Sequence, residues 1–176
     1  IPSNAQVFTE DYQMITQNYG KNATNKAYAY VQTQGLNEET MTQQADRFTI
    51  LRQDNDAHAV YDSKSKTLAA TMWSQGGGSV NGFTINTQGS LLVEDKAQYI
   101  DIHFADPSQS VREVKLSVEG IDHQDVLLPS NVKRISDNEF VINSDSKLGN
   151  THTIRLIKTV DKIDLEDLVT EVKDIE

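Results

Sequence analysis

The aromatic residues are the side chains whose chemistry is easiest to imagine in this sequence. Trp73 is the single tryptophan, and Tyr28, Tyr30, Tyr61 and Tyr99 are tyrosines in strand-like stretches. Together these rings could form a platform on which sugar rings stack. Aromatic side chains also dominate buried cores and interfaces. We therefore expect Trp73 to serve core or inter-domain packing, and we keep it as the one candidate carbohydrate-binding residue.

The histidines could bind a metal ion, because imidazole is a common zinc ligand. His58, His103 and His152 each fall in the middle of a strand-like stretch, and none has a second ligand at the spacing of a metal site along the sequence. We interpret them as packed or solvated side chains. The sequence predicts no metal site and no cofactor.

Acidic clusters and a glycine-rich loop could indicate a calcium site and a phosphate-binding loop. The clusters at 54–56, 94–95 and 137–139 could hold calcium, but none has the regular loop of oxygen ligands that a dedicated site shows. The loop Gln75–Ser79 contains three consecutive glycines, yet no Lys-Ser or Lys-Thr follows and no helix is signalled after it. We predict solvated turns for the clusters and a hairpin tip or strand connection for the loop.

The stretch from Phe48 to Trp73 contains the clearest strand signals. Runs rich in Val, Ile, Thr and Tyr alternate with polar turn residues, which predicts strands over 48–52, 57–61 and 67–73. On the last of these, Leu68, Ala70 and Met72 share one face and Trp73 lies on the other, more polar face. Either a bulge turns Trp73 away from that face, or something else covers it.

Further strands are predicted along the rest of the chain. Residues 99–104 and 113–118 alternate apolar and polar side chains, as antiparallel strands with one wet face do. Shorter strand signals occupy 82–85, 90–94, 126–128, 139–142 and 151–158. Many short strands separated by turns predict a mostly β protein, folded as an antiparallel β-sandwich.

Two helices and two further strands complete the expected elements. Residues 36–45 predict a short connecting helix, with Asn37 as its cap and acidic residues in its first turn. The strands are expected over 12–19 and 26–31. Leu165, Leu168, Val169 and Val172 recur at helical spacing, which predicts an acidic helix at the C-terminal end that leads into a further domain.

Charge and composition exclude several classes of function. The formal net charge is −10, with 26 acidic and 16 basic residues, so the chain should repel nucleic acid. There is no cysteine, which excludes disulfides and thiolate metal sites. No apolar run approaches the ~20 residues that a membrane span needs. The chain begins like an excised part of a larger protein.

Two stretches resemble the family 8 polysaccharide lyases, which include hyaluronate, chondroitin and xanthan lyases. The segment Tyr19-Gly-Lys-Asn-Ala-Thr-Asn-Lys-Ala-Tyr-Ala-Tyr-Val31 is similar to the family pattern His-Gly-x-Asn-Pro-Thr-Asn-Ala-x-Tyr-x-Tyr-Val, which closes the central β domain. Residues 53–73 resemble the hairpin that opens the C-terminal β domain. The chain departs from the pattern at Tyr19, at Ala23 and over 32–34.

The resemblance implies a domain organisation. Residues 1–35 would be the terminal strands of the central β domain, 36–46 a linker helix and 47–160 the C-terminal β-sandwich domain. Residues 161–176 would be an acidic helix leading to a domain outside this chain.

The resemblance also implies a function for the parent protein. Such lyases cleave uronate polymers by β-elimination, in which a base removes the proton beside a carboxylate that other side chains neutralise. Those groups come chiefly from an N-terminal helical domain, so we carry over no catalytic residue. The expected partners are the N-terminal catalytic and central β domains of the same protein, with polysaccharide as a further ligand and no nucleic acid, in a secreted or cell-surface bacterial enzyme.

The expected role is therefore that of a non-catalytic C-terminal β region that supports the catalytic domain. Net negative charge agrees with this role, because a cleft for an anionic polymer should be basic. Two alternatives stay open at this point. The chain could be an autonomous carbohydrate-binding module, or it could be a structural spacer of a surface protein.

Overall fold

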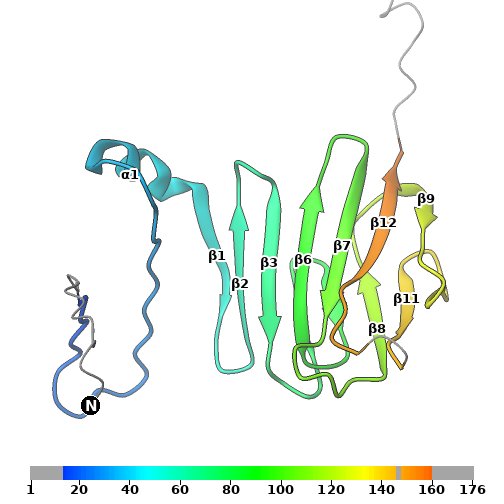
Figure 1. Cartoon of the computed structure of the whole chain (residues 1–176), viewed down its shortest axis with the longest axis horizontal. Helices are drawn as coiled ribbons and strands as arrows, with labels where there is room; N and C mark the ends of the chain where they lie inside the picture. The colour runs from blue at the N-terminus through cyan, green and yellow to red at the C-terminus, as the bar shows by residue number, and fades with distance from the viewer. Residues whose placement is uncertain (1–13, 146–147, 160–176) are drawn as a thin grey trace, which may run out of the picture. The chain divides into compact units, whose positions relative to one another are not determined.

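The computed structural model describes residues 14–145 and 148–159 (Figure 1). The chain divides into two units, Ile1–Leu36 and Asn37–Glu176. The acidic helix that the sequence predicts over 161–176 lies outside the described residues.

The second unit is a two-sheet antiparallel β structure, which confirms a mostly β, sandwich-like fold. Its elements in chain order are α1 (Glu38–Gln44), η1 (Ala45–Arg47), β1 (Phe48–Gln53), β2 (Ala57–Asp62), β3 (Thr67–Met72), β4 (Gly78–Val80), β5 (Phe83–Ile85), β6 (Gly89–Asp95), β7 (Tyr99–Ala105), β8 (Glu113–Val118), β9 (His123–Leu127), β10 (Val132–Arg134), β11 (Glu139–Asn143) and β12 (His152–Lys158).

The strands form a larger and a smaller sheet that share one core. The larger sheet has seven strands in the order β1-β2-β3-β6-β7-β12-β9, and the smaller has five in the order β10-β11-β8-β5-β4. Figure 1 shows most of the larger sheet face on, with β8 and β11 at its β12 side. Apolar side chains from both sheets make one buried cluster, which includes Met72, Phe104, Leu116 and Phe140. Burying the apolar faces of two amphipathic sheets against each other is what stabilises this architecture.

The predicted alternation is confirmed on the central strands. Ile100, Ile102 and Phe104 of β7 are buried, as are Leu68, Ala70 and Met72 of β3. Side chains between these positions point to the opposite face, which we call the outer face of the larger sheet.

The β4–β5 hairpin corrects the prediction for the glycine-rich loop. We expected 75–79 to be a hairpin tip or a strand connection. Residues 75–77 do connect β3 and β4, but β4 already begins at Gly78 and pairs with β5. The two residues between these strands, Asn81 and Gly82, have φ values of 46° and 85°. Asn-Gly is the strongest short hairpin signal because both positions of such a turn need positive φ. This signal was present in the sequence and was missed, as was the short strand β10.

The connecting helix is confirmed as α1, Glu38–Gln44. The Asn37 side chain accepts a hydrogen bond from the backbone N–H of Thr40 at 2.9 Å, and the Thr40 hydroxyl accepts one from the backbone N–H of Asn37 at 3.1 Å. Asn37 therefore caps the helix as predicted, because its side-chain oxygen accepts from a first-turn N–H group that has no acceptor within the helix.

The first unit differs from the prediction. The described part of this segment, residues 14–36, contains no helix or strand, although we expected strands over 12–19 and 26–31. A strand needs a neighbour for its backbone N–H and C=O groups, and none pairs with these residues among those the structure describes. Left-handed φ values at Asn22 and Asn25 do confirm the turn-rich connection expected between the two runs.

Candidate functional surface

Trp73 lies at the end of β3, on the outer face of the larger sheet. It is 50% exposed, so it does not belong to the core. Its backbone N–H donates to the carbonyl of Asp56 at 2.8 Å, which extends the β2–β3 pairing by one step. Its ring meets the His58 ring edge to face, with centroids 4.7 Å apart. No bulge turns Trp73 away from the face that the alternation assigns to it.

The tyrosines are not gathered around Trp73 in the second unit. Tyr61 packs against the buried core, on the opposite face of the sheet from Trp73. Tyr99 lies under the guanidinium of Arg155, whose central carbon is 3.8 Å from the ring centroid. Tyr28 and Tyr30 belong to the first unit, where their rings stack on each other with centroids 6.2 Å apart.

An apolar row crosses four adjacent strands of the outer face. Ile50 of β1 lies opposite Val60 of β2, Val60 opposite Ala69 of β3, and Ala69 opposite Leu92 of β6. Ile50 is 51% exposed, and Val60 and Leu92 are both more than one third exposed. We call these four residues the outer row.

The row continues into a polar group on the next two strands. Leu92 lies opposite His103 of β7, and His103 lies opposite Thr153 of β12. The Nδ1 atom of His103 is 2.9 Å from the hydroxyl oxygen of Thr153, and its Nε2 atom is 3.2 Å from a carboxylate oxygen of Glu94. With Nε2 protonated, His103 donates to Glu94 and accepts from Thr153, so both ring nitrogens have partners.

Glu94 and Asp101 lie directly opposite each other on β6 and β7. Two facing carboxylates would repel, and each is neutralised by its own cation. Lys96 donates to Glu94 at 2.9 Å, and Arg155 donates to both oxygens of Asp101 at 2.6 and 2.7 Å. The hydrogen bond from Arg155 is the main reason that the pKa of Asp101 lies below its usual value.

Glu94, Asp101 and His103 are the residues of the described chain that come together as three potential metal ligands. One ligand atom from each lies within 4.8 Å of the others. Sequence spacing along one strand does not show this grouping, because it forms across the β6–β7 pair. A metal ion would have to compete with the cations that already neutralise the two carboxylates, so we interpret the group as a structural ion network.

All five arginines of the chain form ion pairs with aspartates. Arg47 pairs with Asp62, Arg52 with Asp54, Arg112 with Asp145, Arg134 with Asp137 and Arg155 with Asp101. The Arg52 pair lowers the pKa of Asp54 to about 2. An arginine held by a carboxylate within its own fold has less to offer the carboxylate of a uronate.

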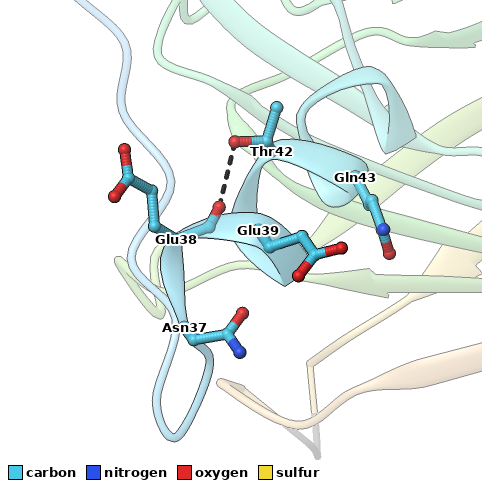
Figure 2. Close-up of a pocket in the computed structure, with 5 residues that line it drawn as sticks. All are labelled: Asn37, Glu38, Glu39, Thr42 and Gln43. Carbon is cyan, nitrogen blue, oxygen red and sulfur yellow. Dashed lines mark hydrogen bonds between the residues drawn. The ribbon is translucent and has the colours of Figure 1, made fainter.

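A shallow hollow beside α1 is lined by Asn37, Glu38, Glu39, Thr42 and Gln43 (Figure 2). Figure 2 shows two carboxylate side chains among these five residues and no cationic or aromatic one. A surface of this composition repels an anionic polymer and offers no ring for a sugar to stack on.

The described residues contain no helix that is long and apolar enough to cross a membrane.

Comparisons with known proteins find similar sequences and similar folds. Residues 49–115 match the C-terminal β-sandwich domain of polysaccharide lyase family 8. The hyaluronate lyase HylB of Enterococcus faecalis is 27% identical over 157 residues, which make up 87% of this chain and 15% of that protein.

Solved structures of two lyases have the same fold. A Paenibacillus xanthan lyase superposes on 71% of this chain and 13% of its own, with a TM-score of 0.66 and 18% identity. A Streptomyces coelicolor chondroitin AC lyase superposes on 71% of this chain and 17% of its own, with a TM-score of 0.64 and 16% identity. The chain spans a small part of each of these relatives. Its residues 49–115 are thus similar to the C-terminal β-sandwich domain of polysaccharide lyase family 8.

Proposed function

We propose that this chain is the non-catalytic C-terminal β region of a secreted bacterial polysaccharide lyase that cleaves hyaluronan or a related uronate polymer by β-elimination. Residues 47–160 form the supporting domain, 36–46 link it to the central β domain, and 1–35 belong to that central domain. Residues 161–176 lead into the next domain. The role of the chain is to pack against the catalytic part and keep it correctly oriented.

The observation that carries this proposal is the pairing of every arginine with an aspartate of the same chain. β-Elimination beside a carboxylate requires that the carboxylate be neutralised, so that the neighbouring proton becomes acidic enough to remove. Guanidinium groups already engaged within the fold are poorly placed for that task. The name of the E. faecalis relative supports hyaluronan as the polymer.

The net negative charge of the chain also supports the non-catalytic role. The chain has a formal net charge of −10, and the hollow beside α1 is lined by two glutamates. Encounter with an anionic polymer is slowed by like charge and accelerated by opposite charge. The polymer is therefore held by the remainder of the parent enzyme.

Assays of two proteins test this division of labour. The isolated chain should release no unsaturated uronate products from hyaluronan, chondroitin or xanthan. The parent enzyme lacking residues 47–160 should lose thermal stability and activity together. Turnover by the isolated chain would overturn the proposal, and so would a truncated parent with unchanged stability and activity.

A carbohydrate-binding module is the second candidate, and the exposure of Trp73 is the observation that favours it. Because Trp73 is the single tryptophan, its fluorescence reports directly on a sugar placed against it. Oligosaccharides of each polymer would be titrated into the chain, with Trp73→Ala as the control for binding measured calorimetrically. Saturable binding that disappears in the variant would favour this function over the scaffold role.

A purely structural spacer is the less favoured reading. Such a module needs an exterior without a continuous apolar surface, since nothing would cover it. The outer row, with Ile50 at 51% exposure, does not fit that requirement.

A further inference from the structure

The turn between β4 and β5 contains the single Asn-Gly dipeptide of this chain, Asn81-Gly82. Asn81 is exposed, and its backbone is left-handed with a φ of 46°. Gly82 has no Cβ, so no side chain shields its backbone nitrogen from the residue before it. The turn therefore places a weak nucleophile, the nitrogen of Gly82, next to the side-chain carbonyl carbon of Asn81.

The two groups that could react are not engaged elsewhere. In the part of the chain that the structure describes, no hydrogen bond holds the Asn81 side chain or the N–H of Gly82. Asn86, at the other end of β5, shows the contrast. Its Oδ1 atom accepts from the backbone N–H of Lys115 at 2.7 Å, which fixes its side chain. The Asn81 amide is free to rotate towards the nitrogen of Gly82.

We propose that Asn81 is a site of spontaneous modification, at which the side-chain amide becomes a carboxylate without an enzyme. The backbone nitrogen of Gly82 forms a bond to Cγ of Asn81, the bond from Cγ to Nδ2 breaks, and ammonia leaves with the proton of the Gly82 amide. Water then opens the five-membered succinimide ring. Ring formation requires Asn81 to leave its left-handed conformation, and exposed turns open locally at a small cost in free energy.

Water can open the succinimide ring at either of two bonds. Cleavage between the Gly82 nitrogen and Cγ restores the normal backbone, with an aspartate at position 81. Cleavage between the same nitrogen and the backbone carbonyl carbon of Asn81 gives isoaspartate, in which the chain runs through Cβ and Cγ. The isoaspartate product therefore has an additional methylene carbon in its backbone, and the aspartate product does not.

The β4–β5 turn has no room for a longer backbone. The carbonyl of Gly82 accepts from the N–H of Glu119 at 2.8 Å, and a Cβ on Gly82 would lie 2.6 Å from the Glu119 carbonyl oxygen. Val80 and Phe83 pair directly across the turn and are 6% and 4% exposed. Because the length of a hairpin loop fixes its register, isoaspartate should loosen the hairpin from the end of β8. Aspartate should not, because Asp tolerates the left-handed conformation.

Incubation of the purified chain at neutral and at mildly alkaline pH tests the modification site. Mass spectrometry of peptides would follow the conversion of each asparagine, and a methyltransferase specific for isoaspartate would quantify that product. Asn55 and Asn138 are internal references, because both are exposed and are followed by Asp56 and Glu139 instead of Gly. Asn81→Gly is the matched unreactive variant, since Gly-Gly also suits a two-residue hairpin turn.

Asn81 should convert about ten-fold faster than Asn55 or Asn138, because the residue after it has no side chain to hinder the attack. The rate should rise with pH, since the attacking nitrogen must lose its proton. In Asn81→Gly, no isoaspartate should form in the peptide that contains this turn. Equal rates at the three asparagines would overturn the proposal, and so would conversion of Asn81 that occurs only when the chain is unfolded in urea.

A second measurement tests the difference between the two products. Ion-exchange chromatography would isolate the isoaspartate form of the aged chain, and Asn81→Asp supplies the aspartate form directly. In the isoaspartate form, hydrogen exchange should become about ten-fold faster at the Glu119 amide, which donates to Gly82, and in β5. Asn81→Asp should exchange like the unmodified chain, and β7 and β12 should be unchanged in both. Equal exchange at Glu119 in the two forms would overturn the proposed effect of isoaspartate on the hairpin.

Discussion

Arg155 grips Asp101 across the β7–β12 pair, with its Nε and Nη2 atoms donating to the two carboxylate oxygens at 2.6 and 2.7 Å. The Asp101 residue is only 7% exposed although it points to the outer face. The same guanidinium lies over the ring of Tyr99. The Arg155 guanidinium thus contacts both the Asp101 carboxylate and the Tyr99 ring on the outer face.

Asp101→Asn should lower the free energy of unfolding by about 1–2 kcal/mol, because a charge-assisted pair of hydrogen bonds becomes a neutral one. Urea denaturation at neutral pH measures the change. Asp137→Asn is the control. Asp137 pairs with Arg134, and the Asp137 side chain is 92% exposed. Exposed pairs of this kind contribute little. A loss of equal size in both variants would contradict the importance of the buried pair.

Asp106 holds the loop after β7 through a set of hydrogen bonds to one carboxylate. Its Oδ1 atom accepts from the backbone N–H and hydroxyl of Ser108, and its Oδ2 atom accepts from the backbone N–H groups of Ser110 and Val111, both at 2.7 Å. Asp106 is 4% exposed. Asp106→Ala should lower the free energy of unfolding by about 2 kcal/mol, because the partly buried hydrogen bonds from the N–H groups of Ser110 and Val111 lose their charged acceptor. The same denaturation experiment applies, and an unchanged midpoint would contradict this role.

The stability of the domain should fall in acid because of Asp106. Burial alone would raise the pKa of this carboxyl, but the hydrogen bonds from Ser108, Ser110 and Val111 together lower it. A folded pKa below the unfolded value of about 3.9 means that the stabilisation is fully present above that pH. It is lost as the pH falls through the folded pKa. Urea denaturation between about pH 6 and about pH 2 should show this loss, with a smaller slope in Asp106→Asn; identical slopes would contradict it.

Gly89→Ala should destabilise the domain through the core and also through the backbone, because Gly89 has a φ of 157° that an L side chain rarely adopts. A Cβ atom at Gly89 would lie 2.4 Å from Cε2 of Phe104, and Phe104 is 1% exposed and cannot move aside. Overpacking of this kind costs about 1–3 kcal/mol. Gly76→Ala is the matched control, because the nearest atom to its added Cβ is the Ser74 hydroxyl oxygen at 3.8 Å. Thermal unfolding should separate the two variants, and equal midpoints would show that the core can relax around the added methyl group.

The sequence was sufficient to predict which side chains face the core of the sandwich. It was insufficient to predict which strands are neighbours in each sheet. Alternation in β3 and β7 assigned Met72 and Phe104 to the core, because the side-chain period of a strand is fixed by its geometry. Strand order is not encoded in that period. The contact between His103 and Glu94 depends on which strands are neighbours and on their register, so reading along one strand could not find it.

For Trp73, too, one feature could be predicted from the sequence and another could not. Its face followed from alternation, whereas its contact with His58 needed the β2–β3 register. The expected strands before residue 36 failed for a different physical reason. Their runs of Tyr, Ala and Val suit a strand, but a strand forms only where a neighbour satisfies its backbone groups.

Arg47 and Asp62 fasten the connecting helix to the larger sheet. Arg47 belongs to η1, directly after α1, and its Nε atom donates to Asp62 of β2 at 2.6 Å. The backbone carbonyl of Arg47 also accepts from the N–H of Ser63 at 3.0 Å. The Arg47 pair lowers the pKa of Asp62 strongly, with smaller contributions from hydrogen bonds to Ser65 and Lys64.

Asp62→Asn should therefore loosen α1 and η1 while leaving the sandwich folded. Hydrogen exchange should accelerate at the amides of residues 38–47, where the Met41 N–H donates to the Asn37 carbonyl, and should stay unchanged in β7 and β12. The variant Asp137→Asn again serves as the control, with no change in either region. Unchanged exchange over 38–47 in Asp62→Asn would mean that Ser63 and the helix cap hold this segment without the ion pair.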